Sequence, residues 1–434
     1  TRSGIPPTRT AGAWNGQSVS HDTTLSINYQ DEMINRQAVF QDYNLTFSGG
    51  KNGVVYALSA GYTNQEGSLI NTGLRRYTAR LNTEAEVNEF ITAGANVSFT
   101  NSRNQSQDED GVIQPLYRAL AFTYPTQKLY NPDGSYFSLI QNPVQAMRQI
   151  QRYYVSNRVI GRLYANVALV KKWGIFFKPS LSTDALFFEE NRFVPSTYLN
   201  NNNRRATEAR NRSNVGLISE NLLTFSRQFG KHSLDALAGY SFQREADRTL
   251  RLAVNGGSTD AVQTVNGGAT VTAFGGARTF WTLESVFAQA NYNFADKYLL
   301  SATIRRDGSS KFGEGNRYGY FPSVSAGWRV SDEAFFQSVS FVNDFKLRAS
   351  YGVTGSLQGL GDFQAQGIYD TGRNYEGQAG IAISPTGLTN PRLSWETTQQ
   401  SNVGFDLTLL NRRVNVVADY YVKQTKGILF DVLL

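Results

Sequence analysis

Apolar and polar side chains alternate with a period of two along most of this chain, and no other sequence feature constrains its fold as strongly. Between residues 56 and 62, Tyr56, Leu58, Ala60 and Tyr62 alternate with Ala57, Ser59 and Gly61. About fourteen such segments follow one another, each near the ~10 residues that a tilted membrane strand needs. This is the pattern of a sheet with an apolar medium on one face and a polar medium on the other. The sequence therefore predicts an all-β chain.

A helical membrane protein is excluded by the distribution of apolar residues. Across the 434 residues, no unbroken apolar run approaches the ~18 residues of a spanning helix. The chain instead has 23 Tyr, 27 Phe and 5 Trp. Aromatic side chains are enriched where membrane strands meet the lipid headgroups. The composition is thus compatible with an outer-membrane barrel or with a soluble all-β protein.

Short and long connections alternate strictly between the expected strands. The short turns are Gly50–Gly53, Glu84–Glu89, Lys171–Gly174, Gln228–Lys231, Ala295–Lys297 and Asn411–Arg413. The long connections are Thr63–Arg76, Asn101–Asn157, Phe188–Gly216, Gln243–Thr282, Arg306–Arg317 and Thr354–Gln400. A connection of middling length, Ser331–Asn343, falls on the short-turn side and begins like a single helical turn. Because antiparallel strands place alternate connections at opposite ends, one end of the sheet should carry tight turns and the other bulky loops, as in outer-membrane barrels.

The two faces of the expected strands differ in charge. The apolar face carries aromatic residues toward the strand ends, and the opposite face carries charged residues that would be costly against lipid. We expect that opposite face to line a water-filled lumen. Its candidate lumen-lining residues are Arg80, Arg162, Arg305, Arg329, Lys346, Arg348, Asp406 and Asp419. The alternative is that these residues are solvated on the outside of a soluble sheet.

Several stretches resemble the SusC/RagA family of TonB-dependent outer-membrane transporters of Bacteroidetes. The longest is IRRDGSSKFGEGNRYGYFPSVSAGW at Ile304–Trp328. Others are NLTFSGG at Asn44–Gly50, KHSLDALAGYSFQRE at Lys231–Glu245, and the stretch from Gly387 to Phe430. These stretches contain hairpin signals such as Asp307-Gly308 rather than ligand-binding chemistry.

The resemblance implies a transmembrane antiparallel β-barrel in the outer membrane of a Gram-negative cell. Family members resemble barrels of about 22 strands with a plugged lumen. About fourteen strands would be an internal portion of such a barrel, so we expect the plug and the closing strands to lie outside this chain. Residues 1–43 are expected to form an irregular segment that leads into a partial barrel domain at 44–434.

The resemblance also implies a function and partners. The protein would import oligosaccharides or peptides, driven through TonB by way of the plug, with a SusD-like surface lipoprotein over the long-loop end. Outer-membrane lipid and lipopolysaccharide would surround the barrel. A passive porin, an adhesin or secretion barrel, and a soluble all-β binding protein are the alternatives.

Aromatic residues of the long connections are the candidates for contact with substrate or lid, because rings stack on sugars and pack against peptides. Packing of the loops on themselves is the competing interpretation. The candidates are Tyr117, Tyr124, Tyr130, Tyr136, Tyr198, Trp281, Tyr369, Tyr375 and Trp395.

Catalytic and cofactor chemistry find little support. The chain has no Cys and only two His, His21 and His232, so cysteine chemistry is excluded and a zinc site or Ser-His-acid set is not expected. No cofactor or enzymatic activity is expected. Asp108, Glu109 and Asp110 could hold a structural calcium ion, although such an acidic run is usually just solvated. The formal net charge of +7 is dispersed, which argues against a nucleic-acid partner.

Overall fold

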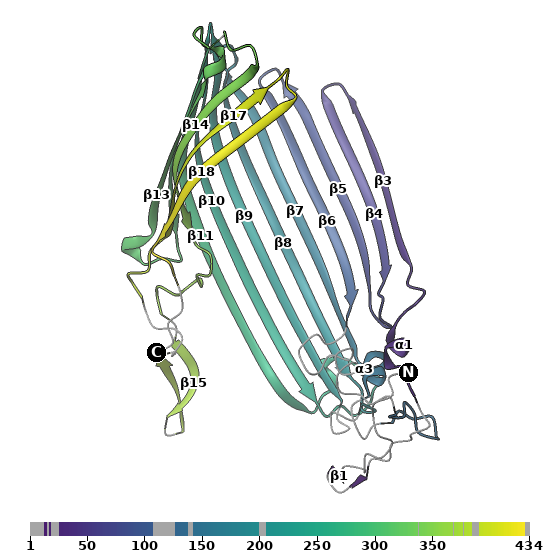
Figure 1. The fold of residues 1–434 in the computed structure, drawn as a ribbon. Helices are drawn as coiled ribbons and strands as arrows, with labels where there is room; N and C mark the ends of the chain where they lie inside the picture. The colour runs from purple at the N-terminus through teal and green to yellow at the C-terminus, as the bar shows by residue number, and fades with distance from the viewer. Residues whose placement is uncertain are drawn as a thin grey trace.

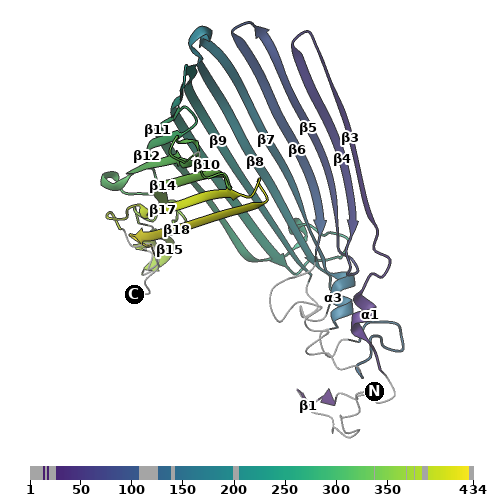
Figure 2. The ribbon, with the colours of Figure 1, turned by 45° about the horizontal axis from the view of Figure 1, so that its top comes forward.

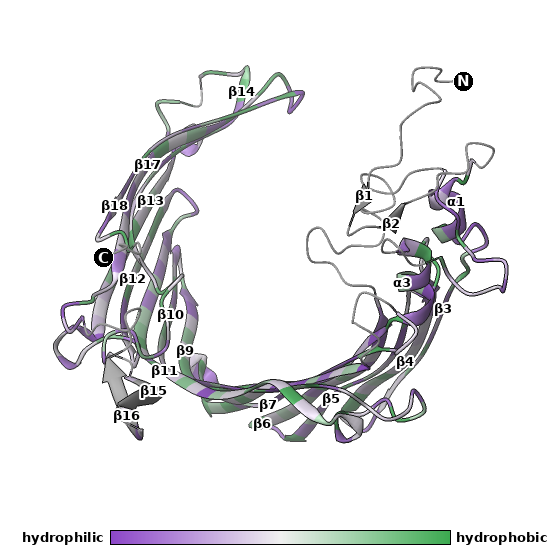
Figure 3. Ribbon diagram, turned by 90° about the horizontal axis from the view of Figure 1, so that it is seen from below, coloured by the Kyte–Doolittle hydropathy of each residue, from purple (hydrophilic) through white to green (hydrophobic). Residues whose placement is uncertain are grey.

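A computed structural model describes residues 13–14, 17–18, 26–106, 126–137, 142–198, 205–336, 338–367, 369–375, 377–383 and 390–429. Most of these residues belong to one 14-stranded sheet in which every neighbouring pair is antiparallel. Figure 3 shows this sheet bent into an open trough, with β3 on one side and β18 on the other. The predicted all-β, partial-barrel fold is therefore confirmed. Among the described residues, no helix is long and apolar enough to cross a membrane.

The sheet follows the chain order with one interruption. Its strands are β3 (Phe40–Lys51), β4 (Val54–Glu66), β5 (Gly73–Asn88), β6 (Ile91–Gln105), β7 (Gln151–Val170), β8 (Ile175–Val194), β9 (Ala206–Phe229), β10 (His232–Asn255), β11 (Thr270–Phe294), β12 (Tyr298–Ser309), β13 (Tyr318–Arg329), β14 (Val342–Ser356), β17 (Glu396–Leu409) and β18 (Val414–Lys426). The hairpin of β15 (Tyr369–Tyr375) and β16 (Gln378–Ile383) lies between β14 and β17 in sequence and forms a separate sheet, as do β1 (Ala13–Trp14) and β2 (Gln17–Ser18).

The tight turns lie at one end of the sheet. Asn52 and Gly53 connect β3 to β4, and both adopt positive φ angles, 52° and 77°. An Asn-Gly pair in this conformation matches the twist of the strands that it joins. The expected single helical turn near Ser331 is confirmed as η6 (Val330–Asp332).

The long connections gather at the opposite end, as Figures 1 and 2 show, where α1 (Tyr29–Met33), α3 (Pro143–Gln149) and β15 also lie. Three small apolar clusters form among the segments at this end. In the first, α1 and α3 meet, and the hydroxyl of Tyr29 donates to the carbonyl of Gln127 at 2.9 Å. Burial raises the pKa of Tyr29 to about 12. The loop end is thus packed on its own side chains.

The predicted lengths of several long connections are wrong. The expected connection Phe188–Gly216 is mostly strand, because β8 continues to Val194 and β9 begins at Ala206. The expected connection Gln243–Thr282 shortens in the same way, since β10 ends at Asn255 and β11 begins at Thr270. In these extensions, between the apolar band and the loops, charged residues lie on both faces, such as Arg210 on one and Arg248 on the other. The hairpins therefore continue without the strict alternation that predicted them.

Candidate functional site

The register shows that one set of residues forms a continuous outward-facing apolar surface. Across β11, β12 and β13, Val286, Ile304 and Val324 lie on this surface, and each is about half exposed. The same apolar surface includes Leu300, which is 49% exposed. Large apolar side chains left open to this extent over so many strands are typical of a face that meets another apolar medium.

Aromatic rings border this apolar surface at both ends. Toward the loops, Tyr43 and Tyr77 flank Tyr62 on β3 to β5, with ring centroids 6.4 and 5.1 Å from it. At the turn end, His232 lies 4.7 Å from the ring of Phe294 and its Nδ1 lies 2.7 Å from the hydroxyl of Tyr292. His232 thus belongs to an aromatic border.

Two further aromatic residues at the turn end form hydrogen bonds with Glu333. The Tyr298 hydroxyl and the Trp328 indole both donate to the carboxylate of Glu333, at 2.6 and 3.2 Å. These two hydrogen bonds lower the pKa of Glu333. The two aromatic borders delimit a band of the outer face as expected for a membrane-spanning wall.

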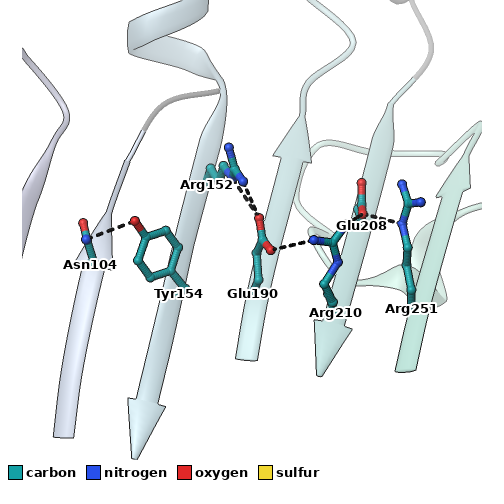
Figure 4. A network of polar contacts seen from close by, with 7 residues as sticks. All are labelled: Asn104, Arg152, Tyr154, Glu190, Glu208, Arg210 and Arg251. Atoms are coloured by element: carbon teal, nitrogen blue, oxygen red, sulfur yellow. Dashed lines mark hydrogen bonds and ion pairs between the residues drawn. The ribbon is translucent and has the colours of Figure 1, made fainter. Parts of the chain in front are cut away.

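The opposite, concave face carries a network of charged residues near the loop end, which we call the ladder (Figure 4). Glu190 on β8 accepts from Arg152 Nε on β7 at 2.8 Å and pairs with Arg210 on β9 at 3.6 Å. Glu208, also on β9, pairs with Arg210 at 3.4 Å and with Arg251 on β10 at 2.7 Å. Positive and negative groups therefore alternate across four strands.

The ladder extends beyond these residues. The side chain of Asn104 on β6 donates to the hydroxyl of Tyr154 on β7 at 3.1 Å. Nearer the turns, Arg212 pairs with Asp247 at 2.7 Å, and Arg158 Nε donates to Asp184 at 2.8 Å. The concave face is thus a polar surface on which both signs of charge are available.

The structure brings some of the predicted lumen-lining residues together. Arg348 lies 2.9 Å from Asp406 and 3.1 Å from Asp419, next to a groove of about 370 Å³ on the same face. Lys346 lines the groove and faces Asp406 across the β14–β17 pair.

The other predicted lumen-lining residues lie apart from that groove. Arg305 pairs with Asp307 at 2.7 Å, and Arg329 with Asp344 at 3.4 Å. Arg162 reaches the Ser180 hydroxyl at 3.5 Å. Arg80 lies on the same face between Ser59 and Ser98. All of these residues lie on the concave face, as the ladder does.

Several aromatic candidates in the long connections pack against the protein itself. Tyr198 is 8% exposed in the second cluster, with Ile150 and Val194. Trp395 packs on Phe312 and Phe321, with centroids 5.1 and 5.2 Å apart.

Trp281 is a strand residue rather than a loop residue. It lies on the concave face of β11 opposite Glu245, with the Lys311 ammonium 5.3 Å from its ring.

The remaining aromatic candidates are more open or undescribed. Tyr130 and Tyr136 pair across a short bridge with centroids 5.1 Å apart, and Tyr130 is 39% exposed. Tyr369 is 67% exposed on β15, and Tyr375 ends the same strand. Tyr117 and Tyr124 lie outside the described residues, as does the acidic run Asp108–Asp110. Among the residues that the structure describes, no cluster of three His, Asp or Glu side chains could hold a metal ion.

Sequence reasoning missed the ladder because it assigned these positions to loops. A signal for it is present: Glu208, Arg210 and Arg212 are charged residues spaced by two, with the uncharged Ala209 and Asn211 between them. Charged residues that alternate with small uncharged residues indicate a strand in water. Apolar residues that alternate with polar residues indicate a strand against lipid in the same way.

Comparisons with known proteins agree with the fold. The family model for "TonB dependent receptor-like, beta-barrel" matches residues 2–433. TonB-dependent receptor P39 of Formosa agariphila is 34% identical over 415 residues, which cover 94% of this chain and 39% of that protein. TonB-dependent receptor SusC of Bacteroides thetaiotaomicron is 27% identical over 94% of this chain and 43% of its own length. The structure of the RagAB peptide transporter superimposes with a TM-score of 0.81 at 23% identity, over 95% of this chain and 47% of that one.

Each relative is longer than the part of it that this chain matches. The chain spans about two fifths of the curated relatives that it matches, with 39% of P39 and 43% of SusC covered. Within that span the match to the family model is nearly complete. The chain therefore belongs to the TonB-dependent receptor-like β-barrel family, and its resemblance to the SusC/RagA transporters is confirmed.

Proposed function

We propose that this protein is an outer-membrane importer that takes up short peptides with energy supplied through TonB. It moves its substrate without making or breaking a bond and needs no cofactor. The observation that carries the proposal is the two-faced wall: an apolar outer face bordered by aromatic rings, and a concave face bearing a ladder of paired charges. A soluble sheet gains nothing from half-exposed apolar side chains over so many strands.

The ladder favours peptides over neutral sugars as the substrate class. A peptide carries an ammonium and a carboxylate at its termini and charges on its side chains. Glu190 and Arg210 offer groups of both signs within 3.6 Å of each other, so a peptide can exchange one ion pair for another as it passes. Such exchange leaves no charge unpaired, which keeps the cost of passage small. RagAB, which has a similar fold, is described as a peptide transporter.

A SusD-like lipoprotein is the proposed lid at the loop end. The exposed rings of Tyr130 and Tyr369 lie on segments of this end and offer apolar contact area. Aromatic residues are enriched in such interfaces. TonB would act from the periplasm through a plug, and lipopolysaccharide would surround the outer part of the wall.

Uptake experiments test this proposal. Cells that express the complete gene are given labelled peptides or labelled oligosaccharides, with a tonB-deficient strain as the energy control. We expect peptide uptake that disappears without TonB and falls at least tenfold in the double variant Arg210→Gln/Arg251→Gln. Thr303→Gln, on the same face but away from the ladder, is the matched control and should leave uptake unchanged.

Each contrary outcome overturns a different part of the proposal. Uptake that persists without TonB would indicate a passive pore. TonB-dependent uptake of oligosaccharides but not peptides would overturn the substrate class alone. Normal peptide uptake by a correctly folded ladder variant would show that the ladder is not on the route.

A further inference from the structure

Four arginines lie on the outer face of the sheet rather than on the concave face that would line a lumen. Arg244 and Arg248 on β10, Arg278 on β11 and Arg306 on β12 have the parity of the apolar outer face, as the register with Ala238, Ala288 and Ile304 shows. We call these four residues the outer arginine patch. They follow the apolar band at its loop end: Arg244 comes two residues after Phe242, and Arg306 two after Ile304. Arg244 and Arg306 thus lie just beyond the apolar band, where lipid headgroups meet such a wall, and Arg248 and Arg278 lie four residues further toward the loops than Arg244.

The outer arginine patch is not neutralised by the protein. On the concave face, Arg152, Arg210 and Arg251 all have a carboxylate within ion-pair distance. Among the described residues, no carboxylate lies at that distance from any arginine of the patch. Glu284 lies on the same face and binds the Tyr240 hydroxyl instead, and Glu189 accepts from Asn191.

The register also places like charges against each other. Arg248 faces Arg278 directly across the β10–β11 pair. Like charges in directly opposite positions destabilise a sheet. The same arrangement recurs at Arg75 and Arg103, which face each other across β5 and β6 on the outer face. On the concave face, by contrast, the facing pair Arg210 and Arg251 has Glu208 against both members.

Aromatic rings hold two of these guanidinium groups with their N–H donors available. Arg306 lies over the ring of Tyr318 at 3.7 Å, and Arg244 over that of Phe280 at 5.5 Å. Stacking leaves the in-plane donors free for bidentate bonds to phosphate. The Nε of Arg306 is buried without a hydrogen-bond partner in the protein. An acceptor from outside can therefore reach only the terminal N–H groups of Arg306.

We propose that the outer arginine patch binds the phosphate groups of a phosphorylated glycolipid of the outer leaflet. Arg248 and Arg278 face each other directly, so one phosphate group can reach both. Arg306 is level with Tyr240, eight residues or about 27 Å along the strand from Arg248, and therefore meets a different phosphate group. Phosphate between Arg248 and Arg278 turns a repulsive pair into two charge-assisted bonds. At the interface, arginine costs only about 0–1 kcal/mol against lipid, so the patch is tolerated there. This inference rests on the outer face being the lipid-facing one, as in the proposed function.

Lipid binding to the complete protein tests the inference. The protein is purified in detergent and titrated with phosphorylated lipid A, with dephosphorylated lipid A and with inorganic phosphate, and binding is followed by native mass spectrometry. We compare wild type with Arg248→Gln/Arg278→Gln. The control, Arg227→Gln, removes an exposed arginine of the same face at the turn end of β9.

We expect the double variant and the removal of phosphate each to weaken lipid binding at least tenfold, while Arg227→Gln leaves it unchanged. Equal binding of phosphorylated and dephosphorylated lipid, or full binding by the double variant, overturns the inference. Displacement of the lipid by inorganic phosphate at equal concentration would also overturn the inference, because the site would then bind free phosphate as well as it binds the lipid. Heat-modifiable mobility of every variant shows that the barrel is intact, so failure here is distinguishable from failure of the importer proposal, which the uptake assay reports.

Discussion

Replacing Ala302 by Arg tests which face of the wall meets hydrocarbon. Ala302 lies on the outer face of β12, with Ala290 and Val324 beside it on the neighbouring strands. It is four residues from Tyr298 at one border and four from Arg306 at the other. Ala302 is thus at the middle of the apolar band. Thr303 on the opposite face, between Gln289 and Ser323, provides the matched control.

The magnitude follows from this position. Four residues of strand span about 14 Å, and a tilt of about 40° leaves about 10 Å of depth to either border. An arginine side chain cannot bring its guanidinium that far into water. Ala302→Arg should therefore cost close to the full midplane value of about 2–4 kcal/mol. Thr303→Arg places the same group in a wet lumen and should cost less than about 1 kcal/mol.

The assay is folding of the complete protein into phospholipid vesicles, followed by heat-modifiable mobility across a urea series. A loss of about 3 kcal/mol lowers the folding equilibrium constant roughly 150-fold, so the Ala302→Arg midpoint should shift clearly below that of wild type. The Thr303→Arg midpoint should stay near that of wild type. Equal shifts in the two variants, or a larger shift for Thr303→Arg, would refute the assignment of the faces.

Three further predictions concern the charged network and the loop end. Glu190→Gln removes the carboxylate that Arg152 and Arg210 share and should destabilise the barrel by about 1.5–3 kcal/mol, seen as a lower urea midpoint. Phe312→Ala empties a side-chain position that is 0% exposed and should weaken the loop cluster by about 3–5 kcal/mol, seen as faster hydrogen exchange in residues 357–367 with the strands unchanged. Asp260 accepts from the Ser196 amide and hydroxyl and from Arg205 Nε at 2.8–3.0 Å. Burial alone would raise the pKa of Asp260, but these partners lower it. A carboxyl with a depressed folded-state pKa stabilises above its unfolded value, near 4, and loses that contribution on acidification. Protease protection of residues 195–198 and of Arg205 should accordingly fall as the pH drops below about 4, and Asp260→Asn should abolish this pH dependence; a variant that keeps it would contradict the assignment.

The strands of the membrane band could be predicted from the sequence because lipid and water impose opposite requirements on adjacent residues. Tyr56, Leu58 and Ala60 against Ala57 and Ser59 show this requirement directly. The tight turns were equally accessible, since Asn52-Gly53 has the residue types that positive φ angles favour.

The extensions of the strands above that band could not be predicted by the same rule. From Ala206 to Asn214 β9 lies beyond the apolar band, so neither face needs to be apolar. What holds these extensions together is cross-strand charge pairing, such as Arg212 with Asp247. Partners of that kind are far apart in sequence and become visible only once the register is known. The burial of the Trp395 and Tyr198 side chains likewise depends on which loops pack together.

The most direct test of the two-faced wall is site-directed spin labelling along β12. The chain contains no Cys, so single Cys substitutions at residues 300–304 can be labelled without background. In vesicles, labels at Leu300, Ala302 and Ile304 should be accessible to oxygen, and labels at Ser301 and Thr303 to a water-soluble nickel complex. Accessibility to the two relaxants that fails to alternate along the strand would contradict a wall with lipid on one side and water on the other.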